Sequence, residues 1–209
     1  GSFMNEKFLE LPKEKQLKII NAGMEYFGKY GYKSASTDDI AARAEISKGL
    51  LFYYFHNKKS FYLYLYDYCA ELMLDYINSS RIQEITDFFD IMDCGAALKM
   101  RMIVDYPYLM SFVMKAYYSQ KEAVTEDINH MIEETISTTF DIYFKNTDWS
   151  KFRDEIDPQQ IYQMLLWMID GYMLDKQRTQ QDISVEDMLV DFNSWKNMFK
   201  KMCYKEEYL

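Results

Sequence analysis

The sequence contains little glycine and proline, with seven and three residues in a chain of 209. Proteins rich in β-turns need many of both residues, so their scarcity disfavours a β-protein and leaves room for long helices. No apolar run approaches the roughly 20 residues that a membrane-spanning helix needs. No basic, then apolar, then small-residue leader is found either. We therefore expect a soluble, mainly helical protein with no membrane partner.

Cysteine and histidine are also scarce. Cys69, Cys94 and Cys203 are odd in number and widely spaced, which disfavours a disulfide framework or a metal site and fits a cytoplasmic protein. His56 and His130 are the two histidines, and no Cys/His spacing is typical of zinc. No glycine-rich phosphate loop and no nucleophile motif appears. We expect no enzymatic activity, no cofactor and no bound metal.

The acidic excess is unevenly distributed. The net charge is −9, which taken alone argues against a nucleic-acid partner. Residues 12–60, however, carry nine Lys/Arg against five Asp/Glu, whereas residues 61–209 carry fourteen against twenty-six. A basic head of net charge +4 thus precedes an acidic body of net charge −12. This separation indicates two tasks on one chain, with any DNA contact at the head.

Helical periodicity and end signals divide the head into short helices. Apolar residues at helical spacing follow Pro12, and Gly31 is a natural stop for that first helix. The segment Ser36-Thr37-Asp38-Asp39 offers an N-cap for a second helix that ends near Glu45, and Ser47 caps a third that runs to about Tyr54. Two short helices separated by a tight turn, inside a basic three-helix unit, are typical of a helix-turn-helix.

The segment after Lys58 is harder to interpret. Residues 61–68, FYLYLYDY, have the composition of a β-strand. They nevertheless continue without glycine or proline to Tyr76, and about twenty uninterrupted residues are too many for an ordinary strand. We therefore predict a helix over residues 58–78. Because it is apolar nearly all round, we expect it to be buried.

The acidic body also shows helical patterns throughout. An apolar face starting at Ile85 predicts a helix to about Asp105, and Pro107 separates it from a shorter helix that ends at Tyr118. Further helices are predicted over residues 121–145, 158–178 and 184–204. The sequence thus predicts an all-α protein, with an N-terminal three-helix helix-turn-helix domain and a larger C-terminal helical domain.

Residues 12–60 resemble the DNA-binding domain of the TetR (tetracycline-repressor) family of bacterial transcriptional regulators. The matching pieces, in order, are Gly31-Tyr32, Ser36-Thr37-x-x-Ile40-Ala41-x-x-Ala44, Ser47-Lys48-Gly49, Phe52-Tyr53-Tyr54-Phe55 and Lys58. The resemblance implies a DNA-binding domain at 5–57, a connecting helix at 58–78, and an effector-binding and dimerisation domain at 79–209. It also implies a double-stranded DNA operator as partner.

The chemistry of the head suggests which side chains contact DNA. Leu51 and Phe55 lie four apart and can bury one side of the third helix. The other side offers tyrosine hydroxyls and a lysine to phosphate or a base edge, and a glycine that permits close backbone approach. Free N–H groups at helix starts also favour phosphate. The predicted DNA-binding residues are Thr37, Ser47, Lys48, Gly49, Leu50, Tyr53, Tyr54 and Lys58.

For the body, the resemblance implies a small-molecule effector and a homodimer. The last two helices, 158–178 and 184–204, would pair with those of a second chain as a four-helix bundle. Candidate residues for binding a small hydrophobic effector are Phe88, Phe89, Met92, Tyr108, Phe112, Met131 and Phe140. The expected function is a ligand-responsive transcriptional regulator, most simply a repressor of a palindromic operator. The alternative is an architectural DNA-binding protein of the same fold without an effector.

Overall fold

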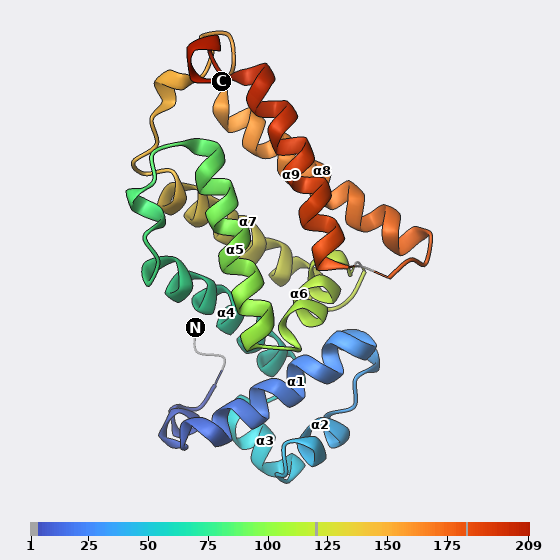
Figure 1. The fold of residues 1–209 in the computed structure, drawn as a ribbon. Coiled ribbons are helices and arrows are strands. Elements are labelled where there is room, and N and C mark those ends of the chain that lie inside the picture. The colour runs from blue at the N-terminus through green and yellow to red at the C-terminus, as the bar shows by residue number, and fades with distance from the viewer. Residues whose placement is uncertain (1–3, 120, 183) are drawn as a thin grey trace. The chain divides into compact units, whose positions relative to one another are not determined.

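The computed structural model describes residues 4–119, 121–182 and 184–209, and these residues form helices (Figure 1). Within these ranges the only β-type pairing is an isolated antiparallel bridge between Phe152 and Tyr204. The all-α prediction is confirmed. The α-helices are α1 (Lys13–Ser34), α2 (Thr37–Arg43), α3 (Lys48–Phe55), α4 (Lys58–Asn78), α5 (Phe88–Asp105), α6 (Leu109–Tyr118), α7 (Thr125–Tyr143), α8 (Pro158–Arg178) and α9 (Val185–Cys203), with 3-10 turns η1 (Glu6–Glu10), η2 (Ile82–Glu84), η3 (Trp149–Lys151) and η4 (Glu206–Tyr208).

Side-chain caps explain why several helix boundaries could be predicted. Asp157 caps α8 by accepting the N–H of Gln159, and proline occupies the first turn, where its missing N–H costs nothing. Ser184 caps α9 by accepting the N–H of Asp187. The strand-like segment 61–68 lies inside α4, so it is helical as predicted. In contrast, η1 was not predicted.

Gly31 interrupts α1 as the sequence predicts. Its backbone dihedrals, φ 79° and ψ 171°, lie in a region that is essentially restricted to glycine. The chain resumes one further helical turn, in which the N–H of Ala35 bonds to the Gly31 carbonyl. Any side chain at this position would strain the turn that leads into α2.

The chain forms two compact units, each with its own core. The first contains residues up to 79 together with 101–140, and the second contains 80–100 together with 141–209. This division by packing is distinct from the functional division proposed from the sequence, in which 5–57 bind DNA, 58–78 connect and 79–209 bind effector and dimerise. That functional division stays a prediction.

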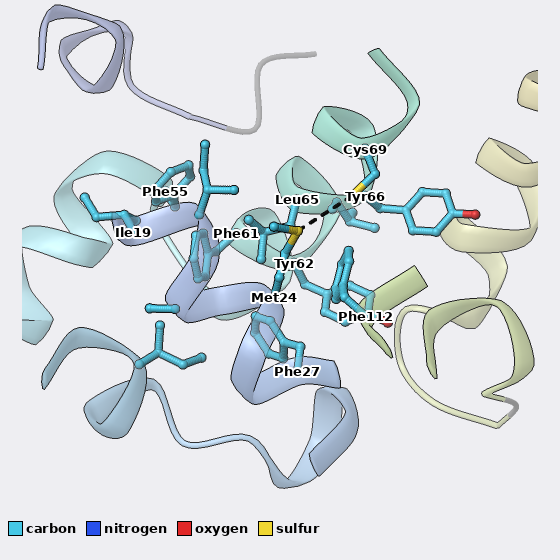
Figure 2. Close-up of a cluster of buried hydrophobic side chains, with 14 of the residues drawn as sticks. Ile19, Met24, Phe27, Phe55, Phe61, Tyr62, Leu65, Tyr66, Cys69 and Phe112 are labelled. Carbon is cyan, nitrogen blue, oxygen red and sulfur yellow. Dashed lines mark hydrogen bonds between the residues drawn. The ribbon is translucent and has the colours of Figure 1, made fainter. Parts of the chain in front are cut away.

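Helices α1, α3, α4 and α6 supply most of the core of the first unit (Figure 2). Phe27 of α1 meets Tyr62 of α4 edge-on at 5.0 Å between ring centroids, and Tyr62 meets Phe112 of α6 at 5.4 Å. The sulfur atoms of Cys69 and Met24 lie 3.8 Å apart in the same cluster. These contacts fix α4 against both the helix-turn-helix and α6. In this half of α4 the prediction of burial agrees with the structure, whereas Glu71 and Asp75 are exposed.

The second unit has an aromatic core centred on the start of α5. Phe88 stacks on Phe144 at 4.8 Å, and Phe89 lies edge-on to Tyr204 at 5.1 Å. Beside these rings, the buried carboxylate of Asp87 accepts hydrogen bonds from Lys151 and from the Tyr204 hydroxyl. Asp87 also caps α5, which explains why that helix begins after the predicted Ile85.

No helix in the described part of the chain is long and apolar enough to cross a membrane.

Candidate nucleic-acid interface

Three consecutive helices, α2, α3 and α4, each begin with a capping side chain. The cap fixes the direction in which the helix starts and leaves the other N–H groups of the first turn free to meet an anion. Asn57 was not foreseen as a cap, although asparagine just before a helix is a known start signal. Each cap accepts a backbone N–H three residues on: Ser36 from Asp39 at 3.2 Å, Ser47 from Leu50 at 3.1 Å, and Asn57 from Ser60 at 2.8 Å.

The turn between α2 and α3 is a Schellman motif. The N–H of Ile46 bonds to the carbonyl of Ala41 at 3.0 Å, and the N–H of Glu45 bonds to the carbonyl of Ala42 at 3.1 Å. Glu45 takes the left-handed conformation, with φ 61°, that this motif requires. The Lys18 ammonium lies 2.7 Å from the Glu45 carboxylate and ties the turn to α1. The two backbone hydrogen bonds of the turn set the angle between α2 and α3.

Helix α3 has one buried and one exposed face. Leu51 and Phe55 are fully buried, as the sequence predicts. The first turn and the position one turn later project outward: Ser47, Lys48, Gly49, Leu50 and Tyr53 are all exposed. These five predicted DNA-binding residues therefore share one accessible surface, which we call the α3 face.

Tyr54 differs from its neighbour Tyr53. Its side chain is only 7% exposed, against 51% for Tyr53, and its ring lies 5.7 Å from that of Phe8 in η1. This burial favours a packing role for the Tyr54 ring. Its contact with DNA stays a prediction.

The two predicted lysines have partners within the protein. The Lys48 ammonium lies 3.3 Å from Asp38, an exposed pair of the kind that contributes little to stability. The Lys58 ammonium donates to the Lys33 carbonyl at 3.2 Å and lies over the ring of Tyr32. Burial lowers the pKa of Lys58, with the Glu122 carboxylate acting in the opposite direction. The Lys58 cation is thus held against the end of α1, and Lys48 lies on the α3 face itself.

Thr37 and Gly49 complete the predicted set. Thr37 is the first residue of α2, half-buried, and Ser36 rather than Thr37 supplies the cap. At Gly49 an added Cβ would meet only the Ser47 hydroxyl, at 4.0 Å. The fold itself therefore does not require glycine there. Glycine at this position instead leaves space for a binding partner to approach the backbone closely.

The predicted effector-binding residues are divided between the two units. Phe88 and Phe89 lie in the aromatic core of the second unit, and Phe112 lies in the core of the first, all fully buried among other rings. Tyr108 is half-buried at the start of α6 and lines an open cleft of about 300 Å³ against α1. Met92, Met131 and Phe140 are half-buried. Their role in effector binding stays a prediction.

No group of three or more His, Cys, Asp or Glu side chains among the described residues is placed to hold a metal ion.

Comparison with known proteins shows which family the helix-turn-helix resembles. Residues 19–65 match the family described as bacterial regulatory proteins of the TetR family. The chain is 24% identical over 189 residues to IcaR of Staphylococcus epidermidis, the negative transcriptional regulator of the biofilm operon icaADBC, covering 90% of this chain and 94% of IcaR. IcaR of Staphylococcus aureus is 36% identical over 62 residues, about 30% of either chain.

Solved structures share the fold along most of the chain. A fatty acid degradation regulator, FadR from Bacillus halodurans, superposes with a TM-score of 0.66 at 16% identity, covering 86% of this chain and 96% of FadR. A TetR-family regulator from Chloroflexus aurantiacus superposes with a TM-score of 0.63 at 17% identity, covering 98% and 100%. The sequence match to the TetR family thus covers residues 19–65, and the likeness to these solved structures shows that the chain shares their fold.

Proposed function

We propose that this chain is a repressor that binds a palindromic DNA operator as a homodimer and releases it when a small hydrophobic effector binds. The observation that carries the DNA-binding part is the α3 face, whose five exposed residues are not needed for the core. A negative regulator among the relatives favours repression over activation. The proposed contacts are phosphate at the helix starts and base edges at Leu50 and Tyr53.

Packing in the first unit supports coupling between an effector and DNA. Gly28 lets α6 approach α1 closely, because an added Cβ would lie 2.7 Å from the Ser111 hydroxyl. Phe112 of α6 also packs against Tyr62 of α4. A displacement of α6 would therefore reach the helix-turn-helix through both α1 and α4. We propose this as the route by which an effector alters the spacing of two DNA-binding heads.

Apolar side chains on α8 and α9 support a homodimer. Trp167 on α8 is 64% exposed and Met198 on α9 is 58% exposed, although both helices pack together through the rings of Tyr172 and Trp195. Contiguous exposed apolar surface is typical of an interface. The proposed dimer face consists of Met164, Trp167, Leu174, Val190, Met198 and Met202.

The DNA-binding part is tested by Gly49→Ala. Because the site is open, the free energy of unfolding should stay the same or rise by up to about 1 kcal/mol. DNA affinity should fall at least about tenfold, because the new methyl group lies on the α3 face. Urea unfolding and fluorescence anisotropy with labelled duplex measure the two quantities.

The same substitution at Gly31 should give the reverse pattern. There the positive φ makes alanine strained, and stability should fall by about 1–3 kcal/mol. Unchanged DNA affinity in Gly49→Ala would contradict our assignment of the α3 face to DNA.

The effector part is tested by linkage. If ligand weakens DNA binding, DNA must weaken ligand binding by the same factor, typically about 5–150-fold. Calorimetric titration of a ligand found by screening, with and without operator, measures both. Equal ligand affinity in the two titrations would favour the architectural alternative, which also gains support from the complete burial of Phe88, Phe89 and Phe112.

A further inference from the structure

The segment before α1, residues Asn5 to Leu11, contacts the end of the recognition helix α3. The backbone N–H of Asn5 donates to the carbonyl of Tyr54 at 2.5 Å. The last four carbonyl groups of a helix have no partner within it, and this one is satisfied from outside. We call residues Asn5–Leu11 the N-terminal clamp.

Phe8 provides the apolar part of this contact. Its side chain is fully buried, with its ring 5.7 Å from Tyr54, 4.9 Å from Phe55 and 5.7 Å from Tyr64 of α4. The ring therefore fills the space where the C-terminal turn of α3 meets α4. Its burial also accounts for the burial of Tyr54.

The clamp is anchored at its other end to α1. The side-chain amide of Gln16 donates to the carbonyls of Leu9 at 3.2 Å and Leu11 at 2.9 Å. The side chain of Asn5 accepts the N–H of Lys7 at 3.0 Å and closes the first turn of η1. The segment thus has a defined conformation that connects α1 with the end of α3.

The turn from α2 fixes the start of helix α3, whereas the end of the helix depends on packing. The helix has only eight residues, and a helix of that length is marginal in isolation, so its stability depends on packing. Its exposed face cannot contribute, because that face is proposed to meet DNA. The packing falls to Leu51, Tyr54 and Phe55, and Phe8 contacts the last two.

We infer that the N-terminal clamp holds α3 in its DNA-binding position, with Phe8 as a positioning residue that does not itself touch DNA. The inference rests on the proposed function, in that α3 is taken as the DNA-reading helix. It predicts that loosening the clamp weakens DNA binding in protein that is still fully folded.

The test compares Phe8→Ala with Leu9→Ala, because Leu9 is exposed in the same turn. Anisotropy with a mixed-sequence duplex, well below the unfolding temperature, should show DNA affinity reduced about tenfold or more for Phe8→Ala. Leu9→Ala should bind as the wild type does, and Phe8→Leu should recover most of the loss. In Phe8→Ala, the rate of hydrogen exchange should increase more at the amides of α3 than at the amides of α6. Unchanged affinity in folded Phe8→Ala, or an equal loss in Leu9→Ala, would overturn the inference.

A second pair keeps the test valid if Phe8→Ala does not fold. Asn5 has φ −78°, which proline can adopt, so Asn5→Pro removes the N–H donor without backbone strain at that φ. Asn5→Ala keeps the N–H and loses only the side-chain cap. Asn5→Pro should bind DNA about three- to tenfold more weakly than Asn5→Ala, as expected for one hydrogen bond. Equal affinities would overturn the clamp, whereas a wild-type protein that binds no duplex would contradict the proposed function.

Discussion

Replacing Asp87 by alanine should lower the free energy of unfolding by about 3 kcal/mol, the cost of breaking a largely buried ion pair. The Asp87 carboxylate accepts the N–H groups of Phe89 and Asp90, both at 3.0 Å. It also accepts the Lys151 ammonium at 3.1 Å and the Tyr204 hydroxyl at 2.9 Å. Removing it leaves these donors without their acceptor beside an aromatic core, which costs more than the bonds themselves contribute.

The pH dependence of this effect has a definite sign. Burial alone would raise the pKa of Asp87, but the backbone N–H of Asp90, the Lys151 ammonium and the Tyr204 hydroxyl together lower it below its ordinary value. A lowered folded-state pKa means that the stabilisation is fully present above the unfolded-state pKa of about 3.9. It is lost as the pH falls through the lower folded-state value.

Urea unfolding at neutral and acid pH measures this prediction. The stabilities of wild type and Asp87→Ala should differ most at neutral pH and approach each other in acid. Asp154→Ala is the matched control, because Asp154 forms only an exposed pair with Lys205 at 3.8 Å and should change stability by less than about 0.5 kcal/mol. A difference between wild type and Asp87→Ala that is independent of pH would show that the charge of Asp87 does not contribute.

Helix boundaries could be predicted from the sequence where their signals are local. A capping serine or aspartate acts on an N–H two or three residues away, so the starts of α3, α8 and α9 are visible in short windows of sequence. The length of α4 was likewise enough to override its strand-like composition. Asn5 caps η1 in the same local way, but the contacts of Phe8 with rings of α3 and α4 are not visible in a short window of sequence.

Side-chain exposure within the site could be predicted only in part. The four-residue spacing of Leu51 and Phe55 identifies the buried face of α3. It cannot separate Tyr53 from Tyr54, whose adjacent tyrosines differ because Phe8 covers one of them. That contact joins residues far apart in the chain, so the periodicity of apolar residues cannot predict it.

The last two helices show the same limit. The apolar stripes that periodicity picks out include Leu165 on α8 and Phe192 on α9, and both are buried within the second unit. The exposed apolar side chains lie on other faces of the same helices. Periodicity locates apolar residues, but it does not tell which of two apolar faces the protein covers itself. The variant that tests the proposed dimer is therefore at Trp167, since a charge at Phe192 would disrupt the unit's own core.

Replacing Trp167 by glutamate should raise the dissociation constant of the homodimer at least about 100-fold. Trp167 is 64% exposed and lies one turn from Met164 and two turns from Leu174 on the proposed dimer face. A tryptophan at the centre of an interface typically contributes 2 kcal/mol or more, roughly thirtyfold. Burying an unpaired carboxylate in its place adds a further penalty.

Light scattering over a dilution series measures this effect, with the wild type expected at twice the chain mass. Val104→Glu is the control, because Val104 is 74% exposed on α5, outside the proposed dimer face, and its charge should leave the dimer intact. Loss of the dimer should also weaken binding to a palindromic duplex far more than to a single half-site, since only the former engages two heads on one molecule. If Trp167→Glu remains a dimer while unfolding as the wild type does, the interface lies elsewhere.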